Sequence, residues 1–167
     1  MDSNNEPIIE KRKLITDVRT VIMSTVDSKG MPNASYAPVG VDDDNNLYVY
    51  ISELSKHTSN LKNNNVLSVM LIEDEAGSEN IFARKRLTMN AKVELIERGS
   101  LDWDENMMYL EDRFGKSIEY LKGMTDFHLF KIVPEDALLV YGFGKAFRFS
   151  GEKMEEMDHL NEKGHKR

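Results

Sequence analysis

Cysteine is absent from this chain of 167 residues. Without cysteine there can be no disulfide, no thiolate nucleophile, no iron–sulfur cluster and no cysteine-based zinc site. The chain also lacks an apolar run of the length that spans a bilayer, and its polar first six residues do not resemble a signal peptide. We therefore expect a cytoplasmic protein with no membrane partner.

Positive charge is scarce as well. The chain has 22 Lys and Arg residues against 29 Asp and Glu residues, which gives a formal net charge of −7. A nucleic-acid-binding protein needs a basic surface to displace counterions from phosphates, so this charge argues against a nucleic-acid partner. The sequence contains no GxGxxG after a strand, no P-loop, no HExxH and no GxSxG. These absences argue against nucleotide phosphotransferases, zinc peptidases and serine hydrolases.

The sequence does contain a series of short β-branched and apolar segments separated by turn residues, a pattern that predicts strands. The expected strands cover residues 20–26, 33–41, 47–52, 66–72, 84–96, 127–133 and 138–149, with a turn at 134–136. Helices are expected near 10–17, at 55–61, at 100–114 and between Gly115 and Gly123. Six or seven strands with few flanking helices and no βαβ alternation predict a mainly β protein, an antiparallel barrel. We expect one domain, residues 1–167, with a tail from about 151.

A basic cluster stands out in this acidic chain. Residues 82–88 read Phe-Ala-Arg-Lys-Arg-Leu-Thr. On a strand, Arg84, Arg86 and Thr88 would share one face, with Lys85 between the two arginines. Guanidinium and hydroxyl donors on a rigid strand suit a carboxylate or a phosphate. The alternative is an ordinary solvated face of the barrel.

Small residues mark a second segment. On a strand, Gly142 and Gly144 would share one nearly bare face with Val140 and Ala146, opposite an aromatic face. Such a flat face allows close approach by a planar ligand or by another backbone. Tight packing at a dimer seam is an equally good interpretation.

Two further features involve single polar residues. Asp126 precedes an expected strand, where aspartate is most often a turn residue, and His57 is expected on the surface of its helix. His165 follows Gly164 close to the last residue, Arg167. Most histidines in such tails are solvated, but a neutral imidazole is also a good ligand for a metal or a haem iron.

The order of these segments resembles the flavin-binding split barrels of the pyridoxamine-phosphate-oxidase superfamily. More narrowly, it resembles the small bacterial haem-utilisation proteins of the HugZ/HutZ type. The stretches that carry this resemblance are 33–38 (NASYAP), 72–75 (IEDE), 82–88 (FARKRLT), 113–115 (RFG), 126–127 (DF), 142–144 (GFG) and the Gly-His pair at 164–165. They follow the order of that family over nearly the whole chain, and plain flavin split barrels lack the Gly-His tail.

The resemblance implies a homodimer of six- to seven-stranded split barrels that holds haem near the subunit interface. It assigns the iron ligand to His165 and implies a hydrogen bond between His165 and Asp126 across the dimer, which would tune the haem electronics. The implied activity is oxidative opening of the haem ring with release of iron. This activity would need oxygen or peroxide and an external electron donor.

Under this hypothesis the bare face at Gly142 and Gly144 receives the haem plane. Arg84 and Arg86 of the basic cluster bind the propionates. Lys85 and Thr88, the other members of the basic cluster, are expected to be cofactor-binding residues as well. One alternative is an FMN-dependent oxidoreductase, in which Arg84, Lys85 and Arg86 hold the flavin phosphate. Another is a non-catalytic haem carrier. The sequence leaves open the electron donor, the tetrapyrrole product and the choice between oxygen and peroxide.

Overall fold

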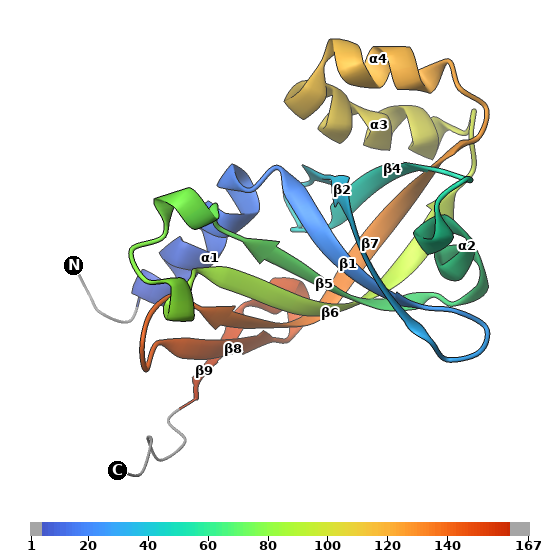
Figure 1. Ribbon diagram of the computed structural model, residues 1–167. Coiled ribbons are helices and arrows are strands. Elements are labelled where there is room, and N and C mark those ends of the chain that lie inside the picture. The colour runs from blue at the N-terminus through green and yellow to red at the C-terminus, as the bar shows by residue number, and fades with distance from the viewer. Residues whose placement is uncertain (1–4, 161–167) are drawn as a thin grey trace.

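The computed structural model describes residues 5–160, which form a curled antiparallel sheet with helices at its ends (Figure 1). The described strands are β1 Thr20–Val26, β2 Pro32–Pro38, β3 Gly40–Val41, β4 Leu47–Ser52, β5 Val66–Ile72, β6 Arg86–Ile96, β7 Phe127–Val140, β8 Ala146–Ser150 and β9 Glu156–His159. The helices are α1 Glu6–Asp17, α2 Lys56–Asn63, α3 Leu101–Phe114 and α4 Lys116–Lys122, and short 3-10 turns are η1 Glu75–Gly77, η2 Ile81–Ala83 and η3 Glu152–Met154.

The sheet order is β2-β1-β5-β6-β7-β4-β3, and β8 adds to β7 and carries β9. Alternation along the strands decides which side chains enter the barrel. In β6, for example, Leu87, Met89 and Ala91 are buried while the residues between them face outward. The inward residues of β1, β4, β5, β6 and β7 form the main core, together with Leu14 and Ile15 of α1.

A second core lies outside the barrel, between β4 and the α3–α4 hairpin (Figure 1). Tyr48 and Tyr50 alternate with the barrel-facing residues of β4, so this strand is buried on both faces. Trp103 and Met107 of α3 pack against these tyrosines, which confirms that the apolar stripe of α3 belongs to the core. Gly40 allows the close approach of α3, because a Cβ atom there would lie 2.8 Å from the backbone carbon of Tyr109.

Arg113 joins α3 to the end of α1. Its Nη1 donates to the carbonyls of Val18 and Val39, at 3.1 and 3.2 Å. Its Nη2 donates to the carbonyls of Ile15 and Thr16, at 3.0 and 3.1 Å. The carbonyls in the last turn of a helix have no partner within the helix, so Arg113 serves as a cap for α1.

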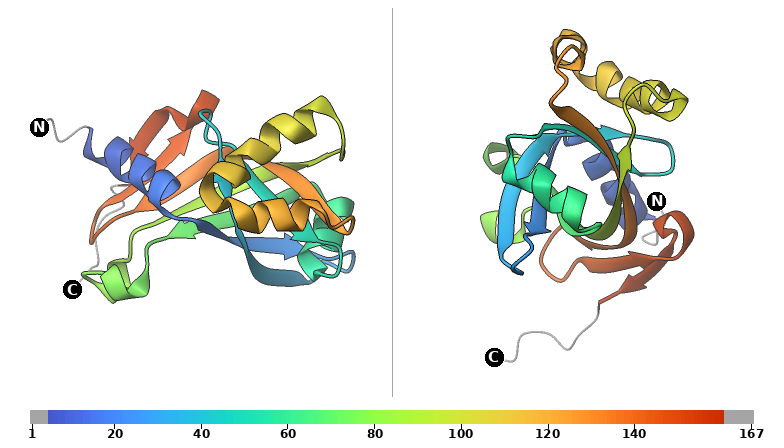
Figure 2. Two further views of the ribbon diagram at one scale, coloured as in Figure 1. Left: turned by 90° about the horizontal axis from the view of Figure 1, so that it is seen from above. Right: turned by 90° about the vertical axis from the view of Figure 1, so that its right-hand side faces the viewer.

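The C-terminal segment is tied to α1 as well. The buried Lys11 donates to the carbonyl of Met154 at 2.7 Å, and its ammonium lies 4.3 Å from the centre of the Phe149 ring. β9 pairs with β8 up to His159, so the first part of the expected tail belongs to the sheet. Figure 2 shows α1 beside this C-terminal hairpin. No helix within residues 5–160 is long and apolar enough to cross a membrane.

Most expected elements are confirmed, and β1, β4, β5 and α4 have the expected bounds. The predicted turn at 134–136 is wrong. Residues 127–140 form one strand with a bulge, in which Ala91 pairs with Pro134 and Asn90 with Asp136, so that Glu135 is the extra residue. Proline has no N–H to donate to the hydrogen-bond ladder of a sheet, and it is accepted at β-bulges. The sequence Pro-Glu-Asp therefore suits a bulge as well as a turn. The count of described strands is nine because 33–41 is divided and β9 was not expected.

Candidate functional site

The outer face of the sheet carries apolar side chains that the described part of the chain leaves partly exposed. Cross-strand register places Tyr36 beside Ile22, Ile22 beside Met70, Met70 beside Thr88, and Thr88 beside Leu138. Tyr36 is 67% exposed and Ile22 is 39% exposed. We call this row the outer row. Exposed apolar patches on a sheet are typical of surfaces that bind another protein or a wide ligand.

Arg86 lies next to the outer row. It pairs with Ile72 on one side and with Val140 on the other, and it shares the outward face of β6 with Thr88. Its guanidinium donates to the carbonyl of Arg84 at 3.0 Å. The sequence therefore placed Arg86 and Thr88 correctly on one face.

The expected position of Arg84 is wrong. Arg84 directly follows η2, two residues before β6 begins, and its side chain turns back onto the preceding loop. Its Nη2 donates to the carbonyl of Glu73, and its Nη1 lies 3.6 Å from a carboxylate oxygen of Glu75. The alternation of a strand does not extend to Arg84 because β6 begins only at Arg86.

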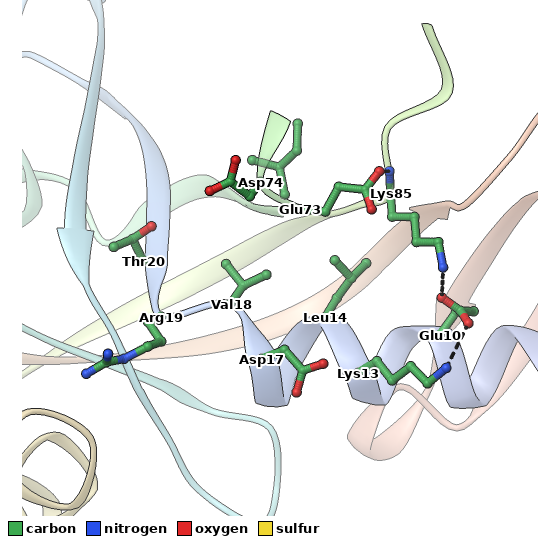
Figure 3. A pocket seen from close by; sticks show the side chains of 11 residues that line it. Glu10, Lys13, Leu14, Asp17, Val18, Arg19, Thr20, Glu73, Asp74 and Lys85 are labelled. Atoms are coloured by element: carbon green, nitrogen blue, oxygen red, sulfur yellow. Dashed lines mark hydrogen bonds and ion pairs between the residues drawn. The ribbon is translucent and has the colours of Figure 1, made fainter. Parts of the chain in front are cut away.

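Lys85 reaches toward α1 and away from the outer row. Its Nζ lies 2.7 Å from Oε2 of Glu10, and this hydrogen bond raises the pKa of Lys85. Glu10 also binds Lys13, so the three charges form a chain along one side of a cavity of about 500 Å³ (Figure 3). The two neighbouring cations of the basic cluster, Arg84 and Lys85, are therefore already paired within the subunit.

Asp126 lies at the opposite end of the barrel, immediately before β7. Oδ2 of Asp126 accepts a hydrogen bond from Oγ of Ser52 at 3.0 Å. The carbonyl of Asp126 accepts from the backbone N–H of Glu53 at 2.7 Å, which fixes the main chain at this point. Within residues 5–160 no donor reaches Oδ1, so that oxygen can accept a further hydrogen bond.

A cavity of about 270 Å³ lies next to Asp126, between β2, β4, α2 and the α3–α4 hairpin. Tyr36, Tyr50, Ser52 and Phe127 contribute to its wall. His57 also lines it, and the expectation that His57 is a surface residue is wrong. This side chain is only 9% exposed, its Nε2 has no partner among the described residues, and burial lowers its pKa.

The expected flat strand at Gly142 and Gly144 is also wrong, because residues 141–145 form the turn between β7 and β8. Tyr141 N–H donates to the carbonyl of Lys145 at 3.1 Å, and Lys145 N–H donates to the carbonyl of Gly142 at 3.2 Å. Gly144 has φ of +70°, a conformation that glycine adopts without strain. The turn holds Phe143 outward, and this side chain is 69% exposed. A planar ligand at this position would therefore meet a turn at the edge of the sheet and not a flat strand face.

His165 and Gly164 lie outside the described residues. The last described residue, Leu160, donates its N–H to the carbonyl of Ala146 at 2.9 Å. His159 stacks on Phe147 with ring centres 4.4 Å apart, at the turn end of β8. The segment that leads to His165 therefore starts beside the turn at 141–145.

Sequence patterns did not reveal the two neighbours of Asp126. Ser52 ends a strand and reads as an ordinary strand residue, and His57 reads as a polar residue of a short helix. Ser52 and Asp126 are 74 positions apart, so only the pairing of β4 with β7 brings them together. A prediction of that pairing is the one signal that could have found Ser52.

Comparison with known proteins shows a family match and a similar protein of known name. Residues 9–141 match the family model described as pyridoxamine 5'-phosphate oxidase. The chain is 41% identical over 149 residues to the haem oxygenase HutZ of Vibrio cholerae, and the match covers 89% of this chain and 84% of that protein.

Solved structures of similar proteins have the same fold. The crystal structure of HutZ from Vibrio cholerae, described there as a haem storage protein, has a TM-score of 0.75 at 36% identity and covers 83% of this chain and 96% of that one. ChuZ from Campylobacter jejuni has a TM-score of 0.82 at 29% identity and covers 92% of this chain and 61% of that one. The expected split-barrel fold is therefore confirmed.

Proposed function

The chain belongs to the pyridoxamine 5'-phosphate oxidase family, and from this membership and its 41% identity to a haem oxygenase we propose that it binds haem and opens the porphyrin ring oxidatively. Haem is then both ligand and substrate, and iron is released for use by the cell. The observation that carries the proposal is that identity over most of both chains.

The active form that we propose is a homodimer joined through the outer row. Ile22, Met70 and Leu138 lie across neighbouring strands; Ile22 is exposed, and Met70 and Leu138 are only partly covered by the described residues. Burial of apolar surface contributes about 25 cal/mol per Å², so a second copy of this face is a favourable cover. Haem presents a wide apolar plane and would fit beside the same row, with Arg86 available to one propionate.

Chain length supports a site shared between subunits. Asp126 precedes the first residue of β7, whereas Leu160 lies two strands from Val140, the last residue of β7. β7 has fourteen residues, and at about 3.3 Å per residue its first and last residues lie roughly 40 Å apart along the strand. His165 is five residues beyond Leu160 and can lie at most about 18 Å from it. Figure 1 shows the two ends of β7 at opposite sides of the molecule, which supports a pairing of Asp126 with the His165 of another subunit.

In the proposed site His165 of one subunit binds the haem iron and Asp126 of the other accepts the N–H of that imidazole. The acceptor fixes the tautomer of the imidazole and makes it a stronger ligand. Haem supplies the iron position at which oxygen or peroxide reacts, and an external donor supplies electrons. The free Oδ1 of Asp126 suits this role because Oδ2 is already occupied by Ser52.

The FMN alternative required three cations to converge on a phosphate. Arg84 contacts Glu73 and Glu75 in the structure, and Lys85 contacts Glu10. Flavin phosphate binding by this cluster would have to break those pairs, which argues against it. The assignment of Gly142, Gly144 and Thr88 as cofactor-binding residues stays a prediction. A cytoplasmic location stays a prediction as well.

The test is a titration of the purified protein with haemin, followed by absorbance. We expect a saturable Soret shift at about one haemin per subunit, lost or altered in His165→Ala. His159→Ala is the control, because His159 is engaged with Phe147 and the carbonyl of Gly144. Addition of a reductant in air then separates an enzyme, which loses its Soret band, from a carrier, which keeps it. Without a specific shift in the wild type, the proposed function fails.

A further inference from the structure

The hairpin formed by β8, η3 and β9 is joined to the rest of the sheet along one short edge. We call this hairpin, residues 146–159, the strap. In the described part of the chain, β8 pairs with only four residues of β7, Ala137 to Val140, and β9 pairs with β8 (Figure 1). The inner side of the strap carries Phe149 and Met154, which are buried in the main core. Burial of these apolar side chains therefore stabilises the closed position of the strap.

The backbone of η3 is strained. Lys153 has φ of +54° and Met154 has φ of +56°, and neither residue is glycine. This left-handed conformation brings the Cβ atom of an L-residue too close to the following carbonyl oxygen. Such backbone persists only where the surrounding contacts impose it. Here the burial of Met154 and the ion pair between Lys153 and Asp44, at 2.6 Å, impose it. Opening of the strap would release the strain.

A buried charge under η3 acts in the same direction as the strain. Lys11 of α1 is 5% exposed, and its ammonium contacts the carbonyl of Met154 at 2.7 Å and the ring of Phe149 at 4.3 Å. No ion pair within residues 5–160 includes this ammonium. Burial and the nearby charge of Arg12 lower the pKa of Lys11, and the attraction of Glu155 offsets only part of this effect. The protonated form of Lys11 is therefore less stable under the closed strap than in water.

We propose that the strap is a loaded conformational device, closed by the burial of Phe149 and Met154 and poised to open as one unit by the strain in η3 and the buried charge of Lys11. Opening would move η3 away from α1, expose Met154 to solvent and leave the edge of β7 at 137–140 without its partner strand. The inference goes beyond the proposed function, because no part of the device requires a bound ligand.

Oxidation of Met154 by hydrogen peroxide measures the opening, because a thioether is oxidised where the reagent reaches it. The haem-free full-length protein is treated with peroxide, and each methionine is followed by mass spectrometry of its peptide. Met108 is 55% exposed and gives the rate for an accessible thioether, whereas the fully buried Met89 gives the rate for global unfolding. We expect Met154 to be oxidised more slowly than Met108 and faster than Met89. A rate equal to that of Met89 would overturn the device, since the strap would then open only with the whole fold.

Two variants of Lys153 separate the strain from the ion pair. Lys153→Gly and Lys153→Ala both remove the contact with Asp44, but only glycine adopts the left-handed conformation without strain. After allowance for the greater freedom of glycine in the open chain, we expect Met154 to be oxidised about fivefold more slowly in Lys153→Gly than in Lys153→Ala. Equal rates in these variants would overturn the contribution of strain. Lys153 is exposed, so neither variant disturbs the core.

The contribution of Lys11 is tested by pH. The pKa of Lys11 is lower under the closed strap than in the open form, so opening takes up a proton and becomes less favourable as the pH rises. We therefore expect the ratio of Met154 to Met108 oxidation to decrease between pH 7 and about 10, where a lysine in water titrates. The comparison is with Lys11→Met, which carries no charge at this position and should lack this decrease.

The other charged groups around η3 affect both proteins alike. Arg12 and Glu155 keep their charges between pH 7 and about 10. The contact with Asp44 raises the pKa of Lys153, and any titration of Lys153 occurs in the wild type and in Lys11→Met. A wild-type ratio that stays constant or increases relative to Lys11→Met would overturn the role of Lys11. Should Lys11→Met fail to fold, the two variants of Lys153 still test the device, and none of these outcomes depends on haem binding.

Discussion

A mixed dimer tests whether Asp126 and His165 act from different subunits. One subunit carries Asp126→Asn and the other carries His165→Ala, and each variant alone lacks one member of every site. In a two-fold dimer with shared sites, the mixed dimer contains one site with both native residues and one site with neither. If both residues came from the same subunit, the mixed dimer would contain no native site.

The geometry and the assembly statistics give the expected size of the effect. The length of roughly 40 Å along β7 against a reach of about 18 Å argues for the proposed pairing between subunits. Random assembly of equal amounts makes half of the dimers mixed, so about one quarter of all sites are native. Purification of the mixed dimer through two different affinity tags raises this to about one half.

The assay is a haemin titration of each pure variant, of the co-expressed mixture and of the doubly tagged mixed dimer. The amplitude of the native Soret shift and the rate of haem loss in air with reductant are compared with the wild type. A homodimer of the chain that carries both Asp126→Asn and His165→Ala gives the background signal, because it contains no native site. A mixed dimer with no more native signal than its two parents would refute the shared site and the reach argument together.

Three further predictions concern the fold around the site. Arg113→Met is expected to lower the free energy of urea unfolding by at least about 3 kcal/mol, since four carbonyls lose a charged donor. The control is Arg148→Met at an exposed position, which should change that free energy little. Gly40→Ala should lower the free energy of unfolding by about 1–3 kcal/mol in the same assay, because the added Cβ meets the backbone of α3. Gly77→Ala is the control, because a Cβ there meets open space. Equal losses of stability in the two variants would contradict the clash at Gly40. Burial lowers the pKa of His57, so the unfolded chain takes up that proton first, and stability decreases as the pH falls through about 6.5. His57→Gln should flatten that decrease, and an unchanged slope in thermal unfolding would exclude His57 as its source.

Local patterns predicted most of the fold. The alternation in β6 and the β-branched segments of β1 and β5 are properties of consecutive residues, so their strands have the expected positions. Ser100 caps α3 by accepting from the N–H of Trp103 at 3.1 Å, and a serine at the start of a helix is a local signal. These features need no knowledge of distant contacts.

The candidate site was predicted only in part. Arg86 and Thr88 share a face because strand geometry alone requires it. Arg84 was misplaced because its guanidinium binds the loop at Glu73, and the glycines at 142–144 were misplaced because a turn and a flat strand favour the same residues. His165 and its pairing with Asp126 stay predictions that come from the resemblance to a family.

The sequence by itself determined most of the elements, the absence of thiol chemistry and the family to which the chain belongs, because each depends on residue types or on residues close together in the chain. Only the tertiary structure decided that Ser52 meets Asp126, that His57 is buried in the wall of the cavity that Ser52 also lines, and that Lys85 turns to Glu10. These contacts join positions far apart in the sequence, 74 in the case of Ser52 and Asp126, and they arise from the curl and register of the sheet. No local pattern carries that information, since side-chain partners are chosen by packing and by the need to pair buried polar groups.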